Sequence, residues 1–243
     1  HRLTGEWSPS AEFFLRLTAT VEEERMPPSR PYPFFLAYPL ESGAVTDEGL
    51  REYQVEWKYD GVRAQVIKRE GEVYIWSRGE ELVTEQFPEL REAASRLPEG
   101  TVVDGEIVAW NGDAPMPFNY LQRRLGRKKV SAREMEETPV HLIVYDCLEA
   151  GGEDIRSLPL SERRTRLETV VEAAGAPSVS LSPTVEVSSL QDLEERRQWA
   201  REHGVEGLML KRRDAPYQEG RKKGLWWKYK VDPFRLDAVL MYA

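Results

Sequence analysis

The stretch that decides the fold and the chemistry of this chain is Glu56-Trp57-Lys58-Tyr59-Asp60-Gly61-Val62-Arg63. Its residues alternate, with apolar Trp57 and Tyr59 on one parity and charged Glu56, Lys58 and Asp60 on the other. Because successive side chains of a β-strand point to opposite faces, a strand here would bury the apolar set and present the charged set along one line. A lysine held in this way is a candidate nucleophile. Half-exposed strands often alternate similarly, so a purely structural role stays open.

The composition is that of a globular protein. The chain has 243 residues, 40% of them hydrophobic and 31% charged, which allows one large domain or two small ones. Its net charge of −8 argues weakly against nucleic acid as a partner, but local patches decide such binding. The candidate patches, with a solvated face as the alternative for each, are Arg123-Arg124 with Arg127-Lys128-Lys129, and Lys211-Arg212-Arg213 with Arg221-Lys222-Lys223.

The order of expected elements favours an α+β fold. Alternation and turn residues predict strands at 53–59, 62–69, 72–77, 101–110, 140–148, 205–211, 226–231 and 236–242. Apolar periodicity and capping residues predict helices over 9–18, 88–97, 118–125, 161–174 and 190–203. The strands mostly adjoin one another, which is typical of antiparallel sheets with helices packed outside. The chain has no G-x-G-x-x-G or Walker A loop, so Rossmann and P-loop folds lose support.

Four further segments place charge inside strand-like sequence. They are Asp104-Gly105-Glu106, Tyr145-Asp146, Glu206-Gly207-Leu208-Met209-Leu210-Lys211 and Trp226-Trp227-Lys228-Tyr229-Lys230. Buried charge is unfavourable unless it is paired, bound to a metal or bound to a ligand. Any one segment could form a structural ion pair, but several in one chain indicate a binding site.

The order of these segments resembles the covalent nucleotidyltransferases, and specifically the adenylation domain of ATP-dependent DNA ligases of the bacterial, archaeal-like type. The matching segments, in chain order, are 35–39, 58–63, 77–79, 104–106, 145–146, 206–211 and 228–230. The resemblance implies two largely antiparallel β-sheets flanked by helices, in the ATP-grasp-like architecture of these enzymes. It also implies that 31–243 is the adenylation domain and that 1–30 is a lead-in helix and linker from a missing N-terminal DNA-binding domain. The C-terminal OB-fold of the family is expected to be absent.

The resemblance implies a role for each candidate residue. Lys58 would attack the α-phosphate of ATP to form lysyl-AMP, and AMP would pass to a 5′-phosphate at a nick in double-stranded DNA before the phosphodiester forms. Lys228 and Lys230 would neutralise charge on the α-phosphate. The implied nucleotide contacts are Glu56, Arg63, Arg78, Glu106, Tyr145, Met209 and Lys211, with core packing open for Tyr145 and Met209. Glu206, with Glu106, would hold Mg²⁺ or Mn²⁺, because such ions bind few carboxylates plus phosphate oxygens.

Other readings stay open at this point. An RNA ligase or a GTP-dependent capping-type nucleotidyltransferase would share the motifs, and a catalytically silent nucleotide-binding or DNA-binding module could retain the fold. The expected partners are ATP and nicked double-stranded DNA, with no membrane and a monomeric state. The expected location is the bacterial cytoplasm, in association with the nucleoid.

Overall fold

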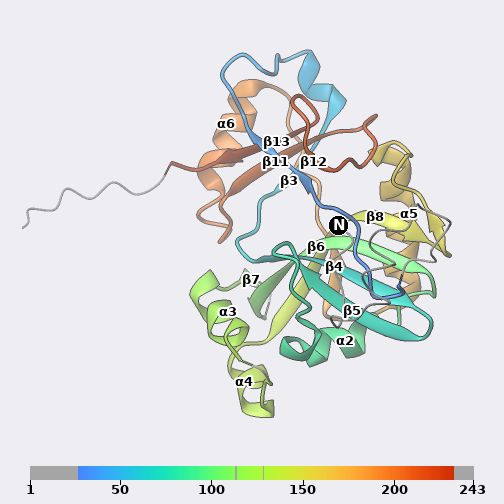
Figure 1. Cartoon of the computed structure of the whole chain (residues 1–243). Coiled ribbons are helices and arrows are strands. Elements are labelled where there is room, and N and C mark those ends of the chain that lie inside the picture. The colour runs from blue at the N-terminus through green and yellow to red at the C-terminus, as the bar shows by residue number, and fades with distance from the viewer. Residues whose placement is uncertain (1–26, 113, 128, 233–243) are drawn as a thin grey trace, which may run out of the picture.

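The computed structural model describes residues 27–112, 114–127 and 129–232 (Figure 1). Its larger sheet has seven strands, in the order β10-β8-β6-β4-β5, with β7 beside β6 and β9 beside β8. These strands are β4 (Val62–Arg69), β5 (Glu72–Ser77), β6 (Thr101–Asn111), β7 (Ala114–Pro115), β8 (Val140–Ala150), β9 (Glu153–Asp154) and β10 (Val179–Leu181). All their pairings are antiparallel except that of β10 with β8.

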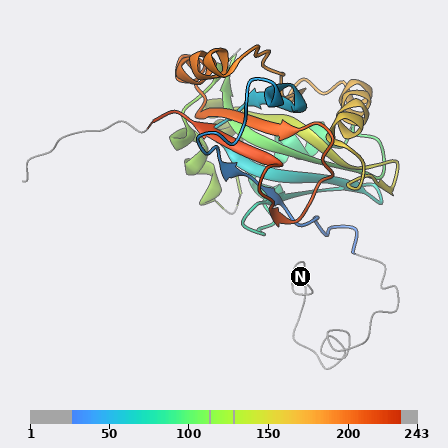
Figure 2. The ribbon, with the colours of Figure 1, turned by 90° about the horizontal axis from the view of Figure 1, so that it is seen from above.

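A four-stranded sheet in the order β2-β13-β11-β3 forms the second layer. Its strands are β2 (Tyr38–Pro39), β3 (Tyr53–Trp57), β11 (Gly207–Arg212) and β13 (Trp226–Lys230). Beside it, β1 (Phe35–Leu36) and β12 (Gly220–Arg221) form a short parallel pair. In Figure 2 the strands of the four-stranded sheet overlie those of the seven-stranded sheet.

The helices cover the outer faces of the two sheets. Helices α2 (Pro88–Ala94), α3 (Phe118–Leu125) and α5 (Leu160–Ala174) contact the larger sheet, and α6 (Leu190–Trp199) contacts β11 of the smaller one. The remaining short helices are η1 (Gly49–Glu52), η2 (Thr84–Gln86) and α4 (Ala132–Glu137). Each sheet therefore has its own apolar core on its outer side.

A third apolar cluster lies between the sheets and joins them. It contains Phe35, Ile67, Tyr217 and Trp226, all nearly or fully buried. Trp227, one residue later, belongs instead to the outer core of the smaller sheet. The alternation of a β-strand thus divides neighbouring tryptophans between two cores.

The α+β prediction with two largely antiparallel sheets is confirmed. Boundaries differ in places: α6 ends at Trp199 instead of continuing to His203, because residues 200–204 form turns. Helix α4 was not predicted. Ser131 and Glu134 form a capping box at its start, and the Ser-x-x-Glu spacing in the sequence could have indicated this helix. The helix predicted at 9–18 and the strand predicted at 236–242 lie outside the described residues.

Candidate functional site

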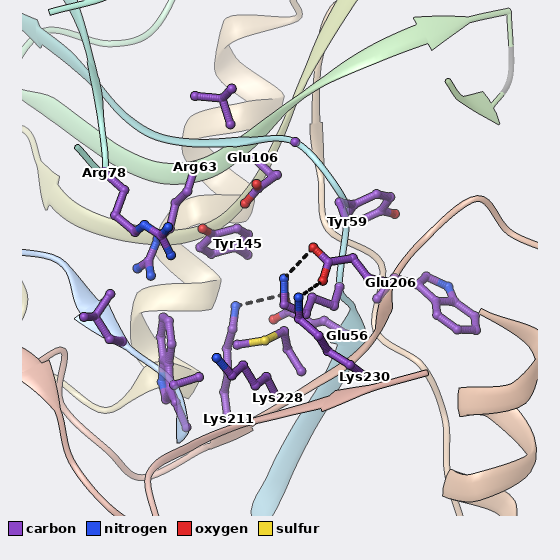
Figure 3. Close-up of a pocket in the computed structure, with 18 of the residues that line it drawn as sticks. Glu56, Tyr59, Arg63, Arg78, Glu106, Tyr145, Glu206, Lys211, Lys228 and Lys230 are labelled. Atoms are coloured by element: carbon purple, nitrogen blue, oxygen red, sulfur yellow. Dashed lines mark hydrogen bonds and ion pairs between the residues drawn. The ribbon is translucent and has the colours of Figure 1, made fainter. Parts of the chain in front are cut away.

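A cavity of about 410 Å³ opens between the two sheets. All eleven side chains predicted for the site line it: Glu56, Lys58, Arg63, Arg78, Glu106, Tyr145, Glu206, Met209, Lys211, Lys228 and Lys230. Figure 3 shows Arg63, Arg78 and Glu106 reaching in from one side, opposite Lys211, Lys228 and Lys230. Residues separated by up to 174 positions in sequence therefore meet in one place, and the cavity has the size of a small-molecule site.

The strand register of the smaller sheet places its side chains on the cavity wall. Met209 in β11 lies opposite Glu56 in β3 and opposite Lys228 in β13. The backbone N–H of Lys58 donates to Gly207 O at 2.8 Å, and Glu206 N–H donates to Lys58 O at 2.8 Å. These bonds extend the pairing of β3 and β11 and bring Lys58 beside Glu206.

Gly207 makes that close approach possible. Its φ of 141° lies in a region that disfavours side chains, and a Cβ there would lie 2.2 Å from Tyr229 O. A Cβ on Gly61 would similarly lie 2.2 Å from Ile107 O, where the chain passes from Lys58 into β4. Gly207 and Gly61 therefore occupy positions where a neighbouring backbone oxygen leaves no room for a side chain.

Lys58 takes part in a half-exposed cluster of charges. Its Nζ donates to Glu206 Oε1 at 3.1 Å, with the two side chains 21% and 22% exposed. Lys230 pairs with the other oxygen of Glu206, as the dashed lines in Figure 3 show. The lysine cations lower the pKa of Glu206 in spite of partial burial, which raises it. The carboxylate is therefore held ionised between two lysines.

Glu56 and Lys211 form a closed pair deeper in the cavity. Lys211 Nζ donates to Glu56 Oε2 at 3.0 Å, and both side chains are 1% exposed. Gln54 Nε2 donates to the other oxygen at 2.6 Å. The ammonium of Lys211 also lies 3.9 Å from the ring centroid of Tyr145. The inner wall of the cavity is therefore a fixed set of polar groups around a buried ion pair.

Glu106 faces the cavity from the larger sheet. It lies opposite Arg63 across the pairing of β6 with β4. Desolvation raises its pKa to about 7, although Lys58 and Arg63 act in the opposite direction. Within the described residues its carboxyl group forms no ion pair, so burial disfavours its charged form, which a bound cation would stabilise.

One end of the cavity carries unbalanced positive charge. Burial lowers the pKa of Lys228, and repulsion from Lys230, Arg221 and Lys58 adds to the effect. In all, seven basic side chains line the cavity against three carboxylates, on a chain whose net charge is −8. Such a site attracts an anion of high charge density.

The lining residues outside the predicted set include Trp226, Arg221 and Trp57. Trp226 lines the cavity beside Lys228, and its position two residues earlier on the same strand face could have revealed it. Arg221 was expected in a basic surface cluster and instead lines the cavity. Trp57 also lines the cavity while its ring stacks on His203 at a centroid distance of 4.7 Å.

Tertiary contacts neutralise part of the charge of the two basic clusters. Arg124 is buried and pairs through both terminal nitrogens with Glu89, while Arg127 pairs with Glu134. In the second cluster, the members that have acidic partners or line the cavity are Lys211, Arg212, Arg221 and Lys223. Arg123, Lys129, Arg213 and Lys222 have no ion pair within the described residues, so DNA binding by the two clusters stays a prediction.

The donors available for a metal ion are few. Among the described residues, no group of three or more His, Cys, Asp or Glu side chains could by itself hold an ion. The two carboxylates of the predicted metal site, Glu106 and Glu206, both line the cavity. Two carboxylates suit an ion such as Mg²⁺ that takes its other ligands from water and phosphate.

Comparison with known proteins identifies the family to which this cavity belongs. A family model described as the ATP dependent DNA ligase domain matches residues 35–230, a range that contains the whole cavity lining. The chain belongs to this ligase domain family. A probable DNA ligase of Anaeromyxobacter sp. is 36% identical over 99% of the chain and 46% of its own length. A DNA ligase of Aeropyrum pernix is 42% identical over 73% of the chain and 30% of its own length.

Solved structures of DNA ligases share the fold. The mycobacterial DNA ligase D complexed with ATP and MES is 29% identical, with a TM-score of 0.63 over 82% of this chain and 60% of that one. The ATP-dependent DNA ligase of bacteriophage T7 complexed with ATP, at 21% identity and a TM-score of 0.60, shares the fold over 82% of this chain and 68% of that one. The ligase domain spans less than half the length of these curated relatives. No helix in its described part is long and apolar enough to cross a bilayer.

Proposed function

We propose that this ligase domain adenylates itself with ATP and passes the AMP to a 5′-phosphate at a nick in double-stranded DNA. The observation that carries the proposal is the position of Lys58: its Nζ lies in a cavity whose wall combines unbalanced cations with a buried polar recess. An anionic triphosphate fits the first feature and a nucleobase fits the second.

In the proposed reaction, neutral Lys58 Nζ attacks the α-phosphorus of ATP. The N–P bond forms, the bond to the β-phosphate oxygen breaks, and pyrophosphate leaves with the electron pair; one amine proton passes to solvent. Lys58 Nζ contacts Glu206 Oε1 in the ATP-free structure, so this contact must break before attack. Lys228 and Lys230 would stabilise the charge on the α-phosphate.

The other wall residues would bind the nucleotide. Glu56, held by Lys211, would accept a hydrogen bond from the adenine amino group, and Tyr145 and Met209 would hold the base. Arg63 and Arg78 would contact ribose or phosphate oxygens. Glu106 and Glu206 would hold Mg²⁺ or Mn²⁺, which when bound neutralises phosphate charge.

The remaining steps involve other parts of the protein. We propose that 31–243 is the adenylation domain and that the additional length of the relatives includes DNA-binding and OB-fold domains that surround the nick. The greater length of the curated relatives, of which the matched region is 46% and 30%, supports this division. Sealing by this chain should therefore be poorer than that by a version extended through an OB-fold, and equal sealing rates would contradict the division.

Intact mass spectrometry tests the first step. After incubation with ATP and Mg²⁺, the wild-type chain should gain one adenylate, and Lys58→Ala should gain none while remaining folded. The matched control is Lys68→Ala, because Lys68 is a buried lysine of β4 that hydrogen-bonds Gly71 O away from the cavity. GTP in place of ATP should give no adduct. Absence of any wild-type adduct, or full adduct on Lys58→Ala, would refute the proposal.

A further inference from the structure

A buried hydroxyl group lies behind the cavity wall, where three separate parts of the chain meet. It belongs to Tyr217, which is 5% exposed, lies between β11 and β12, and does not line the cavity. The hydroxyl donates to Asp104 Oδ2 at 2.6 Å and accepts from Phe35 N–H at 3.1 Å and from Arg63 Nη2 at 3.3 Å. One donated and two accepted bonds use its full hydrogen-bonding capacity.

These contacts determine where Arg63 points. A guanidinium has five N–H donors, and four of those of Arg63 are bound inside the protein. Two go to the carboxylate of Asp104, at 3.1 and 2.6 Å, one to Phe35 O at 2.6 Å and one to Tyr217. One Nη1 N–H remains for a ligand, and its direction is set by the other four.

The same hydroxyl holds the segment 35–37. The backbone of Phe35 is bound on both sides, because its N–H donates to Tyr217 and its carbonyl accepts from Arg63. Its ring is fully buried against those of Tyr217 and Trp226. The next two residues, Leu36 and Ala37, line the cavity. A shift of the Phe35 backbone would therefore move the wall.

We propose that Tyr217 is a positioning residue for the nucleotide. Its hydroxyl holds Arg63 and the segment 35–37 in the arrangement that ATP binds, without contacting ATP itself. The inference rests on the proposed binding of ATP to this cavity. Removing the hydroxyl would leave the N–H of Phe35 and one Nη2 N–H of Arg63 without this acceptor, and Asp104 Oδ2 would keep only its bond from Arg63. These buried neighbours would therefore rearrange.

A second tyrosine provides a matched control. Tyr32 is also 5% exposed, and its hydroxyl donates to a carboxylate, Glu149 Oε2, at 2.8 Å. It lies three residues before Phe35 in the chain but does not line the cavity. Tyr32→Phe therefore removes a comparable buried hydrogen bond away from the nucleotide.

The test measures ATP affinity by calorimetry in a Lys58→Ala background, where no adduct can form, together with the unfolding temperature. Tyr217→Phe should weaken ATP binding at least tenfold, and Tyr32→Phe less than twofold, although both lower the unfolding temperature. Equal affinities for the two variants would overturn the proposal. Asp104→Asn, which removes the charge shared by Arg63 and Tyr217, should also weaken binding tenfold, and unchanged affinity there would overturn it even if Tyr217→Phe does not fold. If the proposed function itself is wrong, the Lys58→Ala protein without a second substitution will bind no ATP, and this result differs from both outcomes above.

Discussion

Two ion pairs in this protein carry similar sequence signals and have opposite structural characters. Asp146 and Arg163 are fully buried and joined by two hydrogen bonds, at 2.7 and 2.9 Å, while the remaining nitrogen of Arg163 bonds the carbonyls of Leu158 and Ala215. Lys58 and Glu206 are about one-fifth exposed, share Lys230, and face a cavity. The first pair is complete without a ligand and the second is not. A charged residue inside a strand therefore indicates a binding site only when its protein partners leave part of its charge or hydrogen-bonding capacity available to a ligand.

The largest effect should come from breaking the closed pair. Arg163→Met would leave Asp146 buried and unpaired, and loss of one partner of such a pair typically destabilises a protein by about 3–5 kcal/mol. Urea unfolding should show this decrease. The control variant Arg133→Met, which removes an exposed pair with Glu137, should leave stability nearly unchanged. Similar losses for the two variants would contradict the contrast.

Breaking the open pair should affect chemistry more than stability. Glu206→Gln keeps the shape of the side chain but removes the charge beside Lys58 and the proposed metal ligand. We expect self-adenylation to slow at least about 100-fold, equivalent to about 2.7 kcal/mol of activation free energy. Adduct formation over time measures this, with Glu168→Gln as a surface control. A rate within threefold of wild type would remove Glu206 from the reaction.

Glu106 should make the stability of the nucleotide-free protein depend on pH. Its folded-state pKa of about 7 lies above its ordinary value of 4.5, so the folded protein binds this proton more tightly. The contribution of Glu106 to the free energy of unfolding is therefore fully present below pH 4.5. It is lost as the pH rises to about 7, by at most about 1.4 kcal/mol per pH unit. Urea unfolding of wild type and Glu106→Gln between pH 5 and 8 should diverge with rising pH, in favour of the variant. Parallel curves would contradict the assigned cause.

The smallest effect concerns the surface charges. Lys222 is exposed and, within the described residues, has no acidic partner, whereas its neighbour Lys223 pairs with Glu41 at 2.7 Å. If Lys222 contacts a DNA phosphate, Lys222→Ala should weaken binding to nicked DNA a few-fold and reduce the slope of log affinity against log salt by about 0.9. Lys223→Ala should change the slope less. Equal slopes in both variants would show that ion pairing does not distinguish these lysines.

The sequence by itself determined the longer strands and the α+β class, and the family resemblance supplied the residues of the predicted site. Alternation in 53–59 and 226–230 is a local property, because neighbouring side chains of a strand must face opposite sides. For that reason the polar face of each strand could be read before its partner strands were known. The eleven side chains that the resemblance implied all line one cavity.

Only the tertiary structure decided which charges remain available. Tyr145 and Asp146 are adjacent in β8, yet Tyr145 lines the cavity and Asp146 is bound to Arg163 from α5. Arg63 is largely bound to Asp104 and Tyr217, and Arg124 to Glu89. The free energy of a charge depends on partners and desolvation that come from distant segments, and no local pattern encodes these.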